Sequence, residues 1–375
     1  MNKFKSISKF TLYLISLVFF LELLVRFFFP YFQENMIFYD VDQDLRKNLE
    51  FKEIHRISKG INTYYKVVDD IQFRVLNKFE NLDFENDNQS VWFFGDSVTN
   101  GYGVEYQNNF PILFNDMLKS EGKKVNIFNN AQYGATINFK NKLLNEATFK
   151  KFKKNDVVIY QFNFNDITEI AKTKNKKSNP NEASFLINLT NNSQVFRYKY
   201  LNHSALIKFL SNYAKKIVRK TSGDCNKRGL FALGEYTHAY LALGFEKESE
   251  ESWNSFENTL LKVRNQLEEK NIDFYVLISP ISLQVVNHSY IDKINLDLSC
   301  STKDARKKIL DFLKKNNFNI VDPLDNFNLS SEMSKKENNF IPLFHLGDTN
   351  HPTKKGHYLI ALELFKKVKN NIVKK

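Results

Sequence analysis

The feature that most constrains the fold of this chain is an alternation between short apolar runs and longer segments in which apolar residues have helical spacing. Five runs, each bounded by turn residues, lie at 91–94, 125–128, 156–162, 274–278 and 318–321. The helical segments lie at 110–118, 140–152, 252–270, 302–316 and 352–368. Uninterrupted apolar strands separated by helices are typical of a parallel sheet covered on both faces. We therefore predict an α/β fold with a five-stranded parallel sheet.

Composition excludes several classes of protein. Hydrophobic residues make up 42% of the 375 residues and charged residues 26%, which is typical of a globular chain and excludes global disorder and fibrous repeats. Two cysteines are too few for a disulfide framework or a four-cysteine zinc site. The formal charge is +12, from 54 basic and 42 acidic residues. The basic residues are scattered and no nucleic-acid-binding motif accompanies them, so we expect no nucleic-acid partner.

The N-terminus contains an apolar stretch at 10–29, preceded by lysines at positions 3, 5 and 9. Glu22 and Arg26 are four residues apart near its far end, where they can pair, so the stretch is long enough to span a bilayer. A cleaved signal peptide is one alternative, but no A-x-A-like site follows. A buried helix of a soluble protein is another, but three lysines flank one side of the stretch and none lies within it. We predict an uncleaved single-pass anchor at 1–33. The positive-inside rule then predicts an extracytoplasmic domain in the cell envelope.

Two further segments show no clear pattern of apolar residues. Residues 34–88 are polar and mixed, and we interpret them as a lead-in or stalk. Residues 167–247 are rich in Asn and Lys and are predicted to be an insertion in the main domain, which spans 89–372. Cys225 and Cys300 can form a disulfide outside the cytoplasm or remain two unrelated thiols, and the sequence leaves both open.

Three polar motifs follow predicted strands or precede the last helix. Gly95-Asp96-Ser97 ends the first apolar run, a segment of four residues from Asn163 to Asp166 follows the third, and another from Asp348 to His351 precedes the helix at 352–368. Alone, each motif is also typical of an ordinary turn or helix cap. Ligands of parallel α/β sheets bind beyond the C-terminal ends of the strands, where these motifs are expected to meet.

The order of these motifs resembles the SGNH (GDSL-type) hydrolases, over about residues 89–372. The resemblance implies a three-layer α/β/α, flavodoxin-like fold. Carried over by position, the family's serine, glycine, asparagine and histidine are Ser97, Gly134, Asn165 and His351. The third motif departs from the family, because Asn163 stands where Gly is usual. Asn tolerates left-handed backbone angles, so we expect the turn to survive.

The resemblance implies acyl-ester chemistry with a catalytic triad. Ser97 would be the nucleophile and His351 its base, since an imidazole's ordinary pKa of ~6.5 suits that task. Asp348 would orient the imidazole. The backbone N–H groups of Ser97 and Gly134 and the side-chain amide of Asn165 would form the oxyanion hole.

The remaining polar residues near these motifs are given structural roles. We expect Asp96 to hold the turn through a backbone hydrogen bond. His345 and His357 are interpreted as surface or packing residues. A metal site formed by them with Asp348 and His351 fits no helix-based zinc motif, so we predict no metal and no other cofactor.

The substrate is the least constrained part of the hypothesis. An anchor and an extracytoplasmic domain favour an O-acyl ester, above all an acetyl ester, of a carbohydrate or envelope polymer. Hydrolysis and acyl transfer differ only in whether water or a sugar hydroxyl attacks the acyl-enzyme. The alternatives are a lipase or lysophospholipase acting on a lipid ester, a non-catalytic envelope assembly protein that keeps the fold, and binding of a polyanion by the basic surface.

Overall fold

The computed structural model describes most of the chain's predicted sheet and helices. The described residues are 2–28, 53–58, 61–68, 71–77, 79–80, 82–85, 87–132, 135, 146–164, 166–167, 206, 210, 247–285, 303–337, 341–345 and 350–372. The chain divides into two units, one of residues 1–39 with 177–234 and one of residues 40–176 with 235–375. Cys225, Cys300 and nearly all of the predicted insertion at 167–247 lie outside the described residues.

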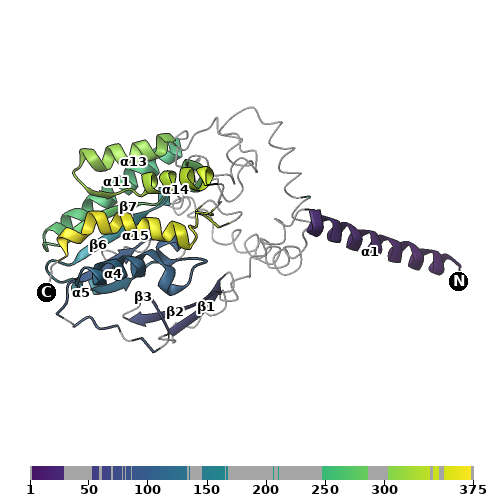
Figure 1. Ribbon diagram of the computed structural model, residues 1–375, viewed down its shortest axis with the longest axis horizontal. Coiled ribbons are helices and arrows are strands. Elements are labelled where there is room, and N and C mark those ends of the chain that lie inside the picture. The colour runs from purple at the N-terminus through teal and green to yellow at the C-terminus, as the bar shows by residue number, and fades with distance from the viewer. Residues whose placement is uncertain are drawn as a thin grey trace, which may run out of the picture. The chain divides into compact units, whose positions relative to one another are not determined.

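The second unit contains a five-stranded parallel sheet (Figure 1). Its strands are β4 (Ser90–Phe94), β5 (Asn126–Asn129), β6 (Val157–Phe162), β7 (Asp273–Ile278) and β8 (Asn319–Val321). Each coincides with a predicted apolar run to within a residue or two. The order across the sheet is β5-β4-β6-β7-β8, with every neighbouring pair parallel. This is the flavodoxin-like order 2-1-3-4-5, which confirms the predicted fold class.

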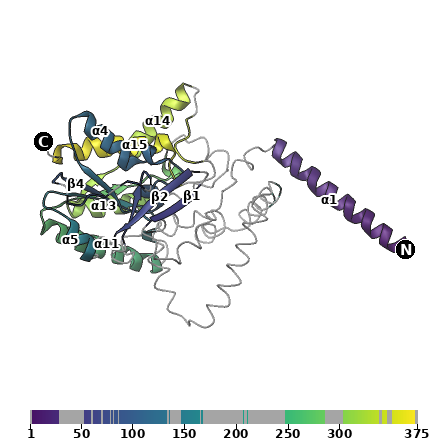
Figure 2. The ribbon, with the colours of Figure 1, turned by 90° about the horizontal axis from the view of Figure 1, so that it is seen from below.

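Helices cover both faces of the sheet. Those of one face are α4 (Phe110–Ser120), α14 (Leu324–Lys336) and α15 (Lys354–Val368), and those of the other are α5 (Glu146–Lys151), α11 (Lys247–Glu268) and α13 (Lys303–Lys315). In Figure 2, α4 and α15 lie on one side of the strands and α5 and α11 on the other. Short helices complete the unit: α3 (Ser97–Asn100), η3 (Tyr106–Asn108), η7 (Ser282–Gln284) and η8 (Lys369–Asn371). Neither α14 nor any of these short helices was predicted from the sequence.

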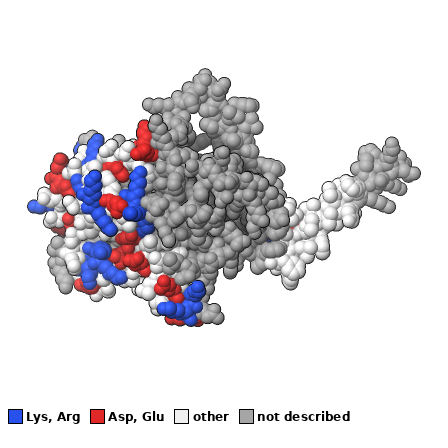
Figure 3. Space-filling view, turned by 90° about the horizontal axis from the view of Figure 1, so that it is seen from above, with Lys and Arg blue, Asp and Glu red and all other residues white. Residues whose placement is uncertain are grey.

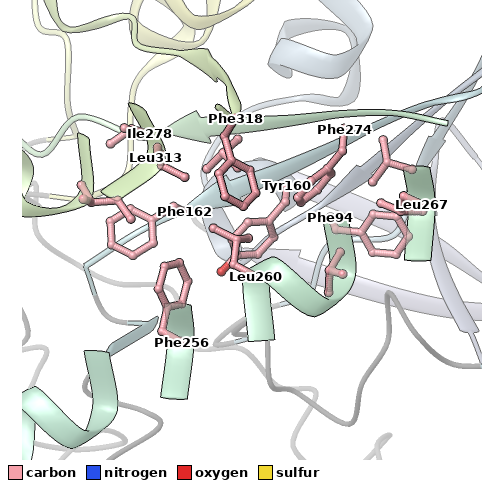
Figure 4. Packing of buried hydrophobic residues seen from close by; sticks show 14 of the residues in the cluster. Phe94, Tyr160, Phe162, Phe256, Leu260, Leu267, Phe274, Ile278, Leu313 and Phe318 are labelled. Carbon is pink, nitrogen blue, oxygen red and sulfur yellow. The ribbon is translucent and has the colours of Figure 1, made fainter. Parts of the chain in front are cut away.

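Successive strand residues alternate between two apolar cores. In β4, Val91 and Phe93 pack toward α4 and α15, whereas Trp92 and Phe94 pack toward α11. The second core is largely aromatic (Figure 4), and the rings of Phe162 and Phe256 lie 5.1 Å apart between β6 and α11. Because nearly all residues of β4, β6 and β7 are buried, these strands are mainly apolar, and their polar residues lie at or near the strand ends.

A three-stranded antiparallel sheet precedes the parallel one. It consists of β1 (Glu53–Ser58), β2 (Ile61–Val68) and β3 (Ile71–Val75), paired in the order β1-β2-β3. Phe73 is fully buried, and its ring lies 6.2 Å from that of Trp92 and 6.1 Å from that of Phe128. The interpretation of 34–88 as a lead-in or stalk is therefore corrected for this part of it, because β3 contributes to the same core as the parallel sheet.

The N-terminal helix belongs to the first unit. Helix α1 (Asn2–Phe28) includes a segment, Phe10–Phe28, of 19 residues with mean hydropathy 2.0, which is long and apolar enough to cross a membrane. A signal sequence near an N-terminus can meet the same criteria of length and composition. Arg26 donates to Glu22 at 2.8 Å, as predicted from their spacing, so the two charges near the end of the segment are paired.

Charged side chains are mixed in sign on the described surface. Figure 3 shows Lys and Arg interspersed with Asp and Glu on the face that it presents. Ion pairs such as Lys369 with Glu121, 3.1 Å apart, join the two signs locally. On the described part of this face, the basic groups are therefore interspersed with acidic ones.

The packing of Phe73 leads to a first prediction. Phe73→Ala removes a ring from the shared core and is expected to lower the free energy of unfolding of the second unit by about 3–5 kcal/mol. Phe79→Ala is the matched control, because the side chain of Phe79 is 78% exposed. Unfolding by urea of the full chain in mild detergent can be followed by tryptophan fluorescence, since both tryptophans, Trp92 and Trp253, are buried in this unit. Equal effects of the two variants would contradict the assignment of β3 to the core.

Candidate active site

Ser97 lies directly beyond the C-terminal end of β4, the second strand from the β5 edge of the sheet. Between the strand and Ser97, Gly95 packs against β6: a Cβ there would lie 2.4 Å from Thr99 Oγ1 and 2.6 Å from Gln161 Oε1. A larger residue would therefore displace these two side chains, which hydrogen-bond each other. Asp96 then caps helix α3, accepting the N–H of Val98 at 2.8 Å. This confirms the predicted turn-holding role of Asp96, and it makes Ser97 the first residue of the helix.

Helix α3 is a single turn, and side chains from elsewhere satisfy its last carbonyl groups. Asn109 Nδ2 donates to Thr99 O at 3.0 Å and to Asn100 O at 3.2 Å. Asn129 Nδ2, at the end of β5, also donates to Thr99 O, at 2.9 Å. A helix this short cannot hold itself, so these amides fix the segment that begins at Ser97. Neither asparagine was predicted from the sequence to lie near Ser97.

His351 lies on a short extended segment just before α15. Phe344 and Pro352 form an isolated antiparallel bridge, and His345 N donates to His351 O at 3.0 Å. Thr353 then caps α15, its hydroxyl accepting the N–H of Gly356. The backbone of His351 is therefore held on both sides, by the bridge and by the helix that follows.

The structure brings Ser97 and His351 together, although 254 positions separate them in the sequence. His351 Nε2 lies 2.7 Å from Ser97 Oγ, which is hydrogen-bond distance, and both side chains are half-buried. The ring of Tyr102 lies 4.5 Å from that of His351, and Tyr102 N donates to Ser97 O at 2.9 Å. Tyr102 therefore contacts both residues, Ser97 through its backbone and His351 through its ring.

Asn163, the departure from the family pattern, contacts the serine motif directly. Its Nδ2 donates to Asp96 Oδ2 at 3.1 Å, and its own Oδ1 accepts the N–H of Phe164 at 2.8 Å. The turn survives as expected, since Asp166 N donates to Asn163 O at 2.9 Å. Its physical reason is not a left-handed backbone, because Asn163 is absent from the described residues with positive φ. Asp166 is buried and accepts the hydroxyl of Tyr160 and the N–H of Asn163.

Three of the predicted site residues lie outside the described residues. They are Gly134, Asn165 and Asp348. Their assignment to the oxyanion hole and the triad stays a prediction. Among the residues that the structure does describe, no group of three or more His, Cys, Asp or Glu side chains could hold a metal ion.

His357 is a packing residue, as predicted. It is fully buried, its ring stacks on that of Phe110 at 5.8 Å, and its Nδ1 accepts the N–H of Phe110 at 3.4 Å. Burial lowers the pKa of His357 well below its usual value, and the nearby charges of Arg74, His345 and His351 lower it further. The imidazole of His357 is therefore neutral in the folded protein at neutral pH.

Comparison with known proteins gives matches only among solved structures. A scan against known protein families finds no match, and a search of curated protein sequences finds none either. An acetyl xylan esterase, AlAXEase, is similar over 74% of this chain and 99% of its own, with 16% identity and a TM-score of 0.40. An acetylxylan esterase of Geobacillus stearothermophilus, Axe2, is similar over 75% of this chain and 94% of its own, with 12% identity and a TM-score of 0.40.

A third solved structure comes from Desulfitobacterium hafniense and is assigned to the G-D-S-L family of lipolytic proteins. It is similar over 74% of this chain and 99% of its own, with 12% identity and a TM-score of 0.37. The similar structures are esterases and lipolytic proteins. Because the identities and TM-scores are low, we base the proposed function on the geometry of Ser97 and His351.

The burial of His357 leads to a second prediction, on pH and stability. The folded-state pKa of His357 lies below the unfolded value of ~6.5, so the unfolded chain binds the proton more readily. Neutral burial of His357 therefore costs no stability above pH ~6.5. Below that pH the free energy of unfolding falls by up to about 1.4 kcal/mol per pH unit, because the unfolded chain is protonated at this histidine. In His357→Gln, which does not titrate, the free energy of unfolding should change less between pH 7.5 and pH 5.5. Parallel pH profiles for this variant and the unmodified protein would contradict the assignment.

Proposed function

We propose that this protein is a serine ester hydrolase in which Ser97 is the nucleophile and His351 the general base. The observation that carries the proposal is the distance of 2.7 Å between Ser97 Oγ and His351 Nε2, beyond the C-terminal end of the sheet. A serine hydroxyl is a weak nucleophile until an adjacent base removes its proton, and this distance allows that transfer.

The proposed reaction proceeds through an acyl-enzyme. Ser97 Oγ attacks the ester carbonyl carbon while its proton passes to His351 Nε2. The tetrahedral intermediate then collapses, the bond to the alcohol oxygen breaks, and the alcohol leaves with the proton from His351. Water attacks the acyl-serine in the same way, giving a carboxylic acid and restoring Ser97.

The remaining groups of the proposed machinery follow from the motifs. Asp348, three residues before His351, would accept the Nδ1–H and keep Nε2 free to take the serine proton. The N–H groups of Ser97 and Gly134 and the amide of Asn165 would donate to the oxyanion. Asn163 supports this last assignment, because its contact with Asp96 links the chain segment before Asn165 to the serine motif.

We propose an O-acyl ester of an extracytoplasmic carbohydrate or envelope polymer, with acetyl as the acyl group, as the substrate. A helix that is long and apolar enough to span a membrane would hold the unit that contains Ser97 at the cell envelope. A polymer of the envelope is within reach of a tethered enzyme. An attacking sugar hydroxyl in place of water would make the same acyl-enzyme an acyltransferase.

A third prediction tests the chemistry. Turnover of p-nitrophenyl acetate by the detergent-solubilised full chain should fall by more than about 10³-fold in Ser97→Ala and in His351→Ala, because each removes a partner of the nucleophilic pair. Asn165→Ala should cost ~10²–10³ in rate, the usual cost of losing an oxyanion donor. His357→Gln, in the same region of the chain but outside the pair, is the control.

Undiminished turnover by Ser97→Ala would remove the assignment, and an inactive unmodified protein would favour a non-catalytic envelope protein. Acetylated glycans, supplied with and without an acceptor sugar, then distinguish the two acyl-group acceptors. Acetate release alone indicates hydrolysis, whereas an acetylated acceptor indicates transfer. Micellar phospholipid in the same assay tests the lipid-ester alternative.

A fourth prediction concerns the anchor. The protein should stay in the membrane fraction after carbonate extraction and keep its N-terminal sequence, because an uncleaved apolar helix resists alkaline release. Protease added to intact cells, or to spheroplasts where an outer membrane is present, should digest the chain beyond residue 33. A chain that starts near residue 30 would instead indicate a cleaved signal, and a protected C-terminal part would reverse the proposed orientation.

A further inference from the structure

Arg74 and Tyr65 form a buried polar pair on one face of the antiparallel sheet. They stand directly opposite each other in the register of β2 and β3, and directly opposed residues share a face. Their side chains are only 2% and 1% exposed. Burying a guanidinium and a phenol is costly unless both are hydrogen-bonded, so their partners indicate what the pair does.

Arg74 binds the turn that follows Ser97. Its Nη1 donates to the carbonyl oxygens of Asn100 and Gly101, the latter at 3.1 Å, and its Nη2 donates to Val104 O at 2.8 Å. One planar guanidinium therefore contacts three backbone carbonyls, which the single nitrogen of a lysine cannot do in the same geometry.

The turn is shaped to admit this side chain. Gly101 caps the C-terminal end of α3 with φ of 83°, a left-handed conformation that favours glycine. A Cβ on Gly101 would lie 2.0 Å from Arg74 Nη1. Both the backbone angle and the approach of the guanidinium therefore require glycine at this position.

Tyr65 binds the same segment through the side chain of Asn100. Its hydroxyl donates to Asn100 Oδ1 at 2.8 Å, and Asn100 Nδ2 donates to Ala131 O at 2.8 Å. Asn100 is fully buried. It therefore links the helix that begins at Ser97 to the segment after β5, three residues before Gly134.

From these contacts we infer that Arg74 and Tyr65 are positioning residues for the reaction. They hold the C-terminal end of the one-turn helix α3, and through it they keep Ser97 Oγ within hydrogen-bond distance of His351 Nε2. Both act through Asn100 and the turn after it. The inference rests on the proposed function of Ser97, and it makes the antiparallel sheet a functional part of the enzyme.

A fifth prediction tests this role with Arg74→Lys, which keeps the charge but loses the planar fork, and Tyr65→Phe, which removes one hydroxyl. Titration with a fluorophosphonate counts the serines that react, and p-nitrophenyl acetate gives kcat and KM per labelled site. Displacing a nucleophile by a fraction of its contact distance slows chemistry, so Arg74→Lys should lower kcat per labelled site by roughly 10–10²-fold, with a smaller change in KM. Tyr65→Phe should act in the same direction and more weakly.

Two control variants separate positioning from folding. Lys123 is another buried cation, 6% exposed, and it donates to the backbone carbonyls of Lys369 and Ile372. It lies just before β5, at the end of the strands opposite to Ser97. Lys123→Gln should reduce the number of labelled sites or their thermal stability while leaving kcat per labelled site unchanged. Tyr64→Phe removes the hydroxyl of the neighbouring residue, on the other face of β2, and should also leave kcat per labelled site unchanged.

Unchanged kcat per labelled site in both Arg74→Lys and Tyr65→Phe would overturn the inference while leaving the proposed function intact. An equal loss in Lys123→Gln would also overturn it, because the effect would then be general. If Arg74→Lys does not fold, Tyr65→Phe decides, since it deletes a single oxygen. An unmodified protein that neither turns over nor labels at Ser97 would refute the proposed function, and this inference with it.

Discussion

A helix of one turn cannot satisfy its own backbone, and the segment that begins at Ser97 is such a helix. Its carbonyl groups accept hydrogen bonds from side chains of three distant segments. Asn109 lies just before α4, Asn129 at the end of β5, and Arg74 on the antiparallel sheet. The position of the Ser97 hydroxyl therefore depends on contacts that form only when these segments fold together. This arrangement gives a buried cation a role at the site without its contacting a substrate.

The parallel sheet could be predicted because its strands are buried on both faces. A run such as the one at 157–162 is buried throughout and has its one amide side chain, Gln161, near its end, so its boundaries appear directly in the sequence. Prediction of burial from the sequence fails where a buried residue is polar. In β3, residues 71, 73 and 75 are apolar and alternate with Gln72 and Arg74, a pattern typical of a half-exposed strand. Arg74 is nevertheless buried, because backbone carbonyls satisfy it.

The predictable part of the site is the part that carries unusual chemistry. A serine after the C-terminal end of a strand and a histidine before the last helix can be recognised by residue type and order. In the structure, Ser97 and His351 lie within hydrogen-bond distance of each other. The residues that hold them do not stand out. Asn109 precedes a helix and resembles an ordinary cap, yet its side chain makes no cap hydrogen bond and binds Thr99 O and Asn100 O instead. Such a role depends on tertiary contacts, which the spacing of residues along the sequence does not reveal.

Asn163 illustrates how a departure from a family pattern can be accommodated physically. Asparagine can replace a glycine where the backbone is left-handed, because it tolerates that conformation. Among the described non-glycine residues, the left-handed conformation occurs at Asn155, Asn271 and Asn317. Asn163 uses its side chain instead, donating to Asp96 Oδ2 while Asp96 Oδ1 caps the helix of Ser97. One buried carboxylate thus joins the segment after β6 to the segment after β4. Replacing the side chain of Asn163 with a hydrogen would leave Asp96 without this donor, so glycine is not the better residue at position 163 in this chain.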